Sequence, residues 1–154
     1  MTYKFLQYFF LAMVLLACEA APKKEKIPLS QLQERLGKET IESIAYPKGV
    51  DVARMVKIQG HFVFDTNRRA LSANEVEQLQ KLLLNGNGYI FDKQKKCLFI
   101  PELAFNISGK KELIILVSPI CKQIKIDDSK RAVVLDYDPM AEELTPFAKS
   151  LLGE

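Results

Sequence analysis

Between residues 97 and 137 the chain alternates apolar segments with short polar turns, and this alternation limits its possible folds more than any other feature. The segments 97–107, 113–126 and 132–135 are rich in β-branched and aromatic residues, which favour strands. The turns between them are shorter than the crossover connection that parallel neighbours require, so successive strands should run antiparallel. The sequence therefore predicts an antiparallel β-meander in this part of the chain.

Helix start signals lie on both sides of the meander. The most definite is the capping box formed by Ser72 and Glu75, which opens a helix with an apolar face. Ser30, as an N-cap, indicates a shorter helix that ends at a glycine. Asp138 as N-cap, followed by a proline, predicts a last helix, which Pro146 in its interior is expected to divide into two.

The remaining segments before the meander favour extended structure. Residues 40–46 are β-leaning, and residues 49–65 have the pattern of strand pieces broken at Gly60. Together these elements predict an α+β fold, an antiparallel β-meander of about four to five strands with two to three helices packed on it. The length suits a single domain over residues 30–154.

The N-terminus carries a second constraint, an apolar run from Phe9 to Ala17 that follows Lys4 and precedes Cys18. This is the layout of a secretory signal peptide, and the run is about half of the roughly 20 residues that a transmembrane helix needs. Leu15–Leu16–Ala17–Cys18 also resembles the lipobox of bacterial lipoproteins. The resemblance implies that residues 1–17 are a signal peptide and that Cys18 is lipidated after cleavage.

The same resemblance implies a location in the cell envelope. Several acyl chains would anchor the protein stably, because each buried methylene contributes roughly 0.8 kcal/mol. Residues 18–29 are charged and lack aromatic side chains, so we expect a tether that could span about 30 Å. Glu19 stands where aspartate tends to mark inner-membrane retention in Gram-negative lipoproteins, which favours the outer membrane. The alternative is an ordinary cleaved signal peptide and release as a soluble protein.

The three cysteines become an even pair once Cys18 is assigned to lipid. In an oxidising compartment the remaining two, Cys97 and Cys121, are expected to form a structural disulfide. They lie at equal sequence distances from Gly109, the centre of the predicted turn, so they would face each other across a hairpin. Two free thiols, or a redox or metal-binding pair, are the alternatives, although neither Cys-x-x-Cys nor a four-ligand zinc spacing is present.

No residue pattern predicts a catalytic, cofactor-binding or metal-binding site. His61 is the single histidine and has no second potential ligand near it in sequence, so we expect an ordinary strand residue. No serine lies in a Gly-x-Ser-x-Gly motif. The acidic cluster of Asp136, Asp138, Glu142 and Glu143 could hold a divalent cation, but a strand end and a helix start account for each carboxylate.

Glycine-rich and lysine-rich stretches are also expected to be structural. Residues 85–88 close a helix, whereas a phosphate-binding loop opens one. Lys93, Lys95 and Lys96, like Lys110–Lys111, should lie on solvated turns, where they could face anionic headgroups. The formal charge of +3 is small and mixed along the chain, and tryptophan is absent, so nucleic acid is not an expected partner.

These features favour a lipid-anchored envelope protein that is not an enzyme and that binds another envelope protein or a surface ligand. One alternative is a small envelope hydrolase or thiol–disulfide factor that uses His61, Asp136 or the cysteine pair. Another alternative is a purely structural spacer of the envelope.

Overall fold

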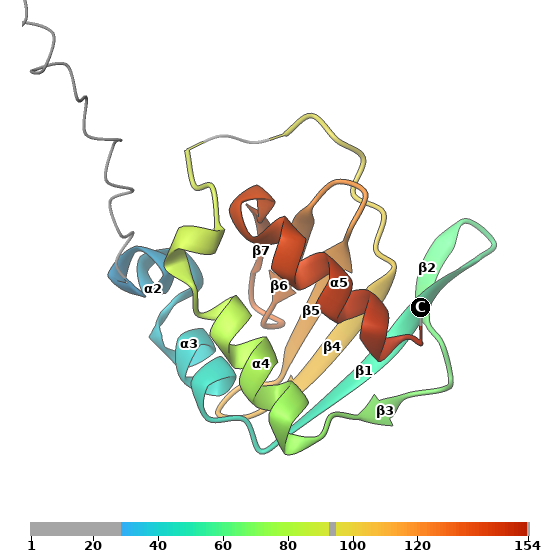
Figure 1. The fold of residues 1–154 in the computed structure, drawn as a ribbon, viewed down its shortest axis with the longest axis horizontal. Helices are drawn as coiled ribbons and strands as arrows, with labels where there is room; N and C mark the ends of the chain where they lie inside the picture. Colours follow the sequence, from blue (N-terminus) through green and yellow to red (C-terminus); the bar gives the residue numbers. More distant parts are fainter. Residues whose placement is uncertain (1–28, 93–94, 154) are drawn as a thin grey trace, which may run out of the picture.

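A seven-stranded antiparallel sheet forms the centre of the fold (Figure 1). The structure is a computed structural model that describes residues 29–92 and 95–153. The strand order is β2-β1-β4-β5-β6-β7, and β3 also pairs with β1. The strands are β1 (Gly49–Ile58), β2 (His61–Phe64), β3 (Arg69–Ala70), β4 (Leu103–Ser108), β5 (Leu113–Ser118), β6 (Gln123–Asp127) and β7 (Ala132–Asp136).

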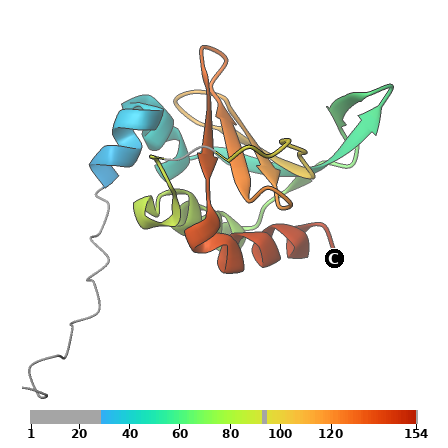
Figure 2. The same cartoon turned by 90° about the horizontal axis from the view of Figure 1, so that it is seen from above.

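The helices lie before, between and after these strands. Figure 2 shows α4 and α5 along one face of the sheet, whereas α2 and α3 lie to one side of it. The helices are α2 (Leu29–Leu36), α3 (Lys38–Ala45), α4 (Ala73–Leu83) and α5 (Ala141–Leu151), with short 3-10 turns η1 (Gly86–Gly88) and η2 (Asp138–Met140). The α+β class and the antiparallel meander β4–β7 are therefore confirmed, with more strands than the four to five that the sequence predicted.

The covered face of the sheet carries the core. Phe105 pairs across the sheet with Val52 and Ile115, and all three side chains are buried. On the opposite face, Ile114 and Val134 are 37% and 41% exposed, because no helix of the described ranges lies over them. The burial thus alternates with the period of two that an antiparallel sheet covered on one side requires.

The prediction of an extended segment over residues 40–46 is wrong, because the structure has helix α3 there. Ile41 and Ile44 are three residues apart, which places both on one helical face, and both are buried in the core. Gly37, with a φ of 86°, separates α3 from α2. Burial of this apolar face outweighs the β propensity of the isoleucines.

The segment 113–126 was expected to be one strand, but a turn at residues 119–122 divides it into β5 and β6. The amide of Lys122 donates to the carbonyl of Pro119 at 3.2 Å, and Lys122 has a φ of 51°. The neighbouring β4–β5 hairpin pairs Ile107 with Leu113, so its centre is Lys110 and not Gly109. The predicted register was therefore off by two residues.

Pro146 does not divide the last helix. Helix α5 continues through Pro146, and the carbonyl of Glu142 that loses its amide partner belongs to an exposed residue that water can reach. Asp138 does not cap this helix with its side chain, since it begins η2 and has no capping hydrogen bond. The predicted helix is present, but its start has a different local structure.

The capping box at α4 is confirmed in both of its hydrogen bonds. Ser72 accepts from the amide of Glu75 at 3.4 Å, and the Glu75 carboxylate accepts from the amide of Ser72 at 2.8 Å. Arg69 of β3 also donates to Glu75 at 3.0 Å through each of two nitrogens. The cap thus joins α4 to the strand that precedes it.

We expect Ser72→Ala to lower the free energy of unfolding by about 1 kcal/mol, because two amides lose their capping arrangement. Ser30→Ala is the matched control, since Ser30, which the sequence predicted as an N-cap, instead lies inside α2, is exposed, and its hydroxyl has no hydrogen-bond partner among the described residues. That control should be neutral or slightly stabilising, by up to about 0.5 kcal/mol. Urea titration followed by circular dichroism would measure both, and equal losses in the two variants would contradict the assignment of the caps.

Candidate functional site

Of the residues predicted to matter chemically, Cys18 and the signal peptide lie outside the described residues. Cys97 and Cys121 form a disulfide with a Cα–Cα distance of 5.9 Å. They are not a cross-strand pair, because Cys97 precedes β4 by several residues and Cys121 lies in the β5–β6 turn. The disulfide therefore fixes the extended segment 95–102 to that turn.

Few other contacts hold this segment in place. The amide of Ile100 donates to the hydroxyl of Ser118 at 3.2 Å, and the amide of Glu102 donates to the carbonyl of Val117 at 2.9 Å. Leu98 is 77% exposed, so it contributes little apolar burial. The covalent bond is consequently the main attachment at the start of the segment.

Lys95 connects the disulfide region to η2. Its ammonium lies 2.5 Å from the carboxylate of Asp138 and donates to the carbonyl of Cys121 at 3.1 Å. Lys95 is thus an ion-paired residue of the fold, in contrast to the solvated turn that the sequence predicted. The ion pair also explains why Asp138 is not available as a helix cap.

We expect the double substitution of Cys97 and Cys121 by alanine to lower the free energy of unfolding by about 3 to 4 kcal/mol, because the unfolded chain loses a loop closure. Urea unfolding with and without reductant would measure the loss. Reductant should destabilise the wild type and leave the double variant unchanged. Two thiols that react with an alkylating agent before any reduction would contradict the disulfide.

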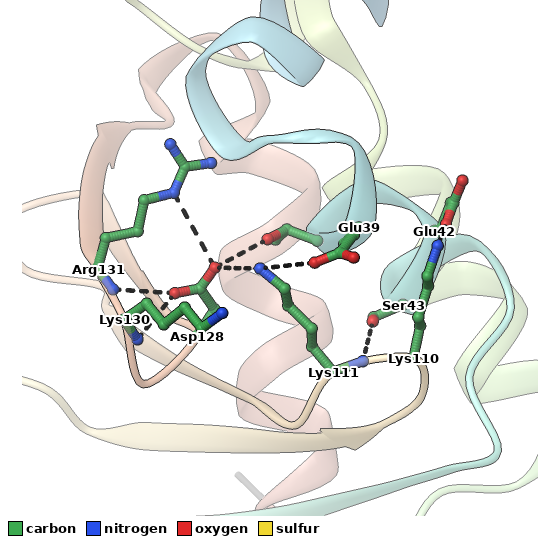
Figure 3. A network of polar contacts seen from close by, with 9 residues as sticks. Glu39, Glu42, Ser43, Lys110, Lys111, Asp128, Lys130 and Arg131 are labelled. Carbon is green, nitrogen blue, oxygen red and sulfur yellow. Dashed lines mark hydrogen bonds and ion pairs between the residues drawn. The ribbon is translucent and has the colours of Figure 1, made fainter.

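A polar cluster centred on Asp128 joins α3 to the β4–β5 and β6–β7 loops (Figure 3). The Asp128 side chain is 4% exposed, and its carboxylate accepts from Lys111 at 3.1 Å and from the hydroxyl of Thr40 at 3.4 Å. The amides of Lys130 and Arg131 donate to its other oxygen at 3.1 and 2.9 Å. Both oxygens of this buried carboxylate therefore accept hydrogen bonds.

The lysines of the β4–β5 loop are part of the same cluster. Lys111 also pairs with Glu39 at 3.1 Å, and Lys110 pairs with Glu42 at 2.7 Å. The amide of Lys111 donates to the hydroxyl of Ser43 at 2.8 Å. Both lysines have carboxylate partners on α3, but they differ in exposure: Lys110 is 55% exposed, as predicted for a solvated turn, whereas Lys111 is 23% exposed.

Burial opposes ionisation of Asp128, but the hydrogen bonds from Lys111 and from the Arg131 and Lys130 amides outweigh it and hold its pKa at about 2. Because this pKa is lower in the folded protein than in the unfolded chain, the unfolded chain binds the proton more readily at acidic pH. The charged carboxylate therefore stabilises the fold above about pH 4, and this contribution is lost as the pH falls towards 2.

We expect Asp128→Asn to lower the free energy of unfolding by about 2 kcal/mol at pH 7, with a difference from wild type that narrows between about pH 5 and pH 2. Asp127→Asn is the control, since that side chain is 38% exposed and its effect should stay under about 0.5 kcal/mol. Urea unfolding across this pH range would test both. Parallel pH profiles for Asp128→Asn and wild type would argue against the linkage.

The residues that the alternative enzymatic reading named as candidates for catalysis do not lie near one another in the structure. His61 lies in β2 and Asp136 in β7, at opposite edges of the sheet and on the order of 20 Å or more apart. Asp136 instead accepts a buried hydrogen bond from Gln123 at 2.7 Å. Glu142 and Glu143 lie in the first turn of α5, and within residues 29–92 and 95–153 no cluster of His, Cys, Asp or Glu is arranged to hold a metal ion.

The described surface has a different concave feature, at the outer edge of β7. A cavity of about 80 Å³ extends along this edge and is bounded on its far side by α2 and by the segment after η1. A larger depression of about 360 Å³ continues from it over α2. The cavity is lined by Arg35, Ile90, Phe91, Gln123, Val133, Val134, Leu135 and Asp136. We call this feature the β7-edge groove.

Arg35 is the charged residue that stands over the groove. Its guanidinium donates to the carbonyl of Phe91 at 3.3 Å, and none of the described carboxylates lies within ion-pairing distance of it. Phe91 is half-buried beside Tyr89, at 6.1 Å between ring centroids. The groove therefore combines apolar side chains, the polar side chains of Gln123 and Asp136, and one cation that has no anionic partner among the described residues.

Sequence reasoning missed the groove. It predicted a strand over residues 132–135, but which strand lies at the edge of a sheet depends on pairings made far along the chain. Arg35 and Phe91 are 56 residues apart, and no spacing motif connects them. The only local signal was the amphipathic pattern of the first helix, which leaves Arg35 on its exposed side.

Comparisons with known proteins give little further information. No protein-family model matches the chain, and no curated protein sequence matches it. Among solved structures, "Crystal Structure of Putative Lipoprotein from Clostridium perfringens" is 15% identical, with a TM-score of 0.46, and covers 88% of this chain and 100% of that chain. Within the described ranges, no helix is both long enough and apolar enough to span a membrane.

Proposed function

We propose that this protein is a lipid-anchored component of the cell envelope that binds a partner protein and has no catalytic activity of its own. The observation that carries the binding role is the β7-edge groove, where a cavity lined by both apolar and polar side chains adjoins a cation that has no anionic partner among the described residues. Binding sites typically combine apolar side chains with a few polar groups that fix the orientation of the ligand. The partner is another envelope protein.

The anchor in this proposal rests on the sequence. Lys4, the apolar run and Leu15–Leu16–Ala17–Cys18 form a signal peptide with a lipobox, so Cys18 carries the lipid. Glu19 after the cysteine favours the outer membrane. A lipid anchor with several acyl chains keeps the protein at the membrane without a membrane-spanning helix.

The absence of catalysis is supported by the positions of the candidate residues. His61 and Asp136 lie on opposite edges of the sheet, and Cys97 and Cys121 are bonded to each other away from a helix start. A hydrolase needs its nucleophile and base within hydrogen-bonding reach, and a thiol–disulfide factor needs an accessible, activated cysteine. Neither arrangement matches these positions.

We expect the wild-type chain to sediment with membranes and to crosslink there to a stoichiometric protein partner, whereas Cys18→Ala should keep the longer, unprocessed chain and take up no fatty-acid label. Metabolic labelling with a fatty acid would mark the wild type alone. Crosslinking followed by mass spectrometry identifies the partner. Ser30→Ala is the matched control, because it leaves Cys18, the processing site and the disulfide unchanged.

Unchanged processing of Cys18→Ala with no fatty-acid label in wild type would remove the anchor from the proposal. No partner on the membrane, together with hydrolase or thiol-oxidoreductase turnover abolished by His61→Ala or Cys97→Ser, would replace the binding role with an enzymatic one. No partner and no turnover would favour a structural spacer.

A further inference from the structure

At the outer edge of β7, some backbone groups have no partner among the described residues. The amide of Ile90 donates to the carbonyl of Asp136 at 2.9 Å, which shows that the backbone of Asp136 points away from β6. In an antiparallel strand every second residue directs its amide and carbonyl to the same side. Ala132 and Val134 therefore direct theirs outward as well, and the structure pairs neither with any described residue.

The groove beside this edge supplies specific side-chain contacts. The apolar side chains of Ile90, Phe91 and Val133 line it, and Arg35 stands over it from α2. Its volume of about 80 Å³ fits one aliphatic side chain. A ligand that fills the groove and pairs with the edge thus needs a backbone, an apolar side chain and an anionic group.

The neighbouring helix limits what can approach. Arg35 of α2 lines the same cavity as Val134, so the helix borders the strand edge closely. A second folded sheet, such as β7 of another copy, would bring a second Arg35 towards the first and would meet α2. A single extended segment is narrow enough to lie between helix and strand, and a carboxylate on it offers Arg35 an anionic partner that the described residues do not supply.

We propose that β7 binds an extended peptide segment of a partner protein as an additional strand, with an apolar side chain in the groove and a carboxylate at Arg35. This mode of binding uses main-chain hydrogen bonds for affinity and alternate side chains for specificity. Ala132 and Val134 form the main-chain bonds, and Asp136 marks the end of the site because Ile90 already occupies it. The proposal rests on the partner-binding function above and names the surface that performs it.

The test uses the full-length chain in lipid nanodiscs and a phage-displayed library of random 12-residue linear peptides. Selected peptides should combine an acidic residue with aliphatic or aromatic residues, and the synthetic peptides should protect the amides of Ala132 and Val134 from hydrogen exchange. Val134→Pro removes the outward amide without touching the β6 ladder, so binding should weaken at least about tenfold. Val134→Thr keeps the amide and the branched shape and should stay within about twofold.

Arg35 provides a second pair of variants. Arg35→Gln should weaken binding about tenfold, and Arg35→Lys, which keeps the charge, should retain most of the affinity. Thermal unfolding of each variant should match wild type, which separates loss of binding from loss of folding. If peptides bind Val134→Pro as well as wild type, or if no peptide is enriched over empty nanodiscs, the proposal is wrong. It is also wrong if the wild type is a dimer that Val134→Pro converts to a monomer.

The same variants, expressed in cells, distinguish a failure of the β7 site from a failure of the partner-binding function on which it rests. Loss of the membrane-crosslinked partner in Val134→Pro, with retention in Val134→Thr, supports the β7 site. A partner that persists in Val134→Pro overturns the β7 site while partner binding stands. The absence of any crosslinked partner in wild type overturns partner binding itself, and with it the physiological role of the site.

Discussion

The burial of one face of the sheet under the helices is the interaction on which the rest of the structure depends. Phe105 at the centre of that face meets β-branched neighbours from both adjacent strands, and the core helices α4 and α5 lie across it. Because the opposite face is left without a helix in the described ranges, most of the large buried side chains of the strands lie on the covered face, although Ala104 of β4 and Ser118 of β5 are also buried on the other face. This distribution of buried side chains fixes the register of each pair of strands.

Polar contacts and the disulfide stabilise loops that contribute few side chains to the apolar core. At one end of the strands Asp128 collects donors from two loops and from α3, while at the other end the disulfide and Lys95 attach an extended segment. Both sets connect parts of the chain that contribute little to the core. Polar contacts thus stabilise the loops at one end of the sheet and a disulfide stabilises those at the other. Between them, β7 has no further strand beside it among the described residues, apart from the bridge between Ile90 and Asp136.

Local patterns predicted most elements, and long-range contacts decided the rest. The Ser72 capping box and the meander follow from nearby residues, so the sequence is sufficient for them. Helix α3 was missed because the burial of Ile41 and Ile44 depends on the tertiary structure, and the hairpin register was missed because the pairing centres on Lys110. The β7-edge groove could not be predicted at all, since Arg35, Phe91 and Val134 come from three separate segments.

The disulfide also affects when the segment 95–102 becomes fixed during folding. Without it, the beginning of the segment 95–102 retains only an ion pair and a few hydrogen bonds, so the reduced chain has a less constrained segment next to β4. Thiols stay reduced in the cytosol, and they form disulfides in an oxidising compartment. A chain exported across a membrane would therefore acquire its last constraint after crossing, which leaves it easier to unfold while it is still on the side of synthesis.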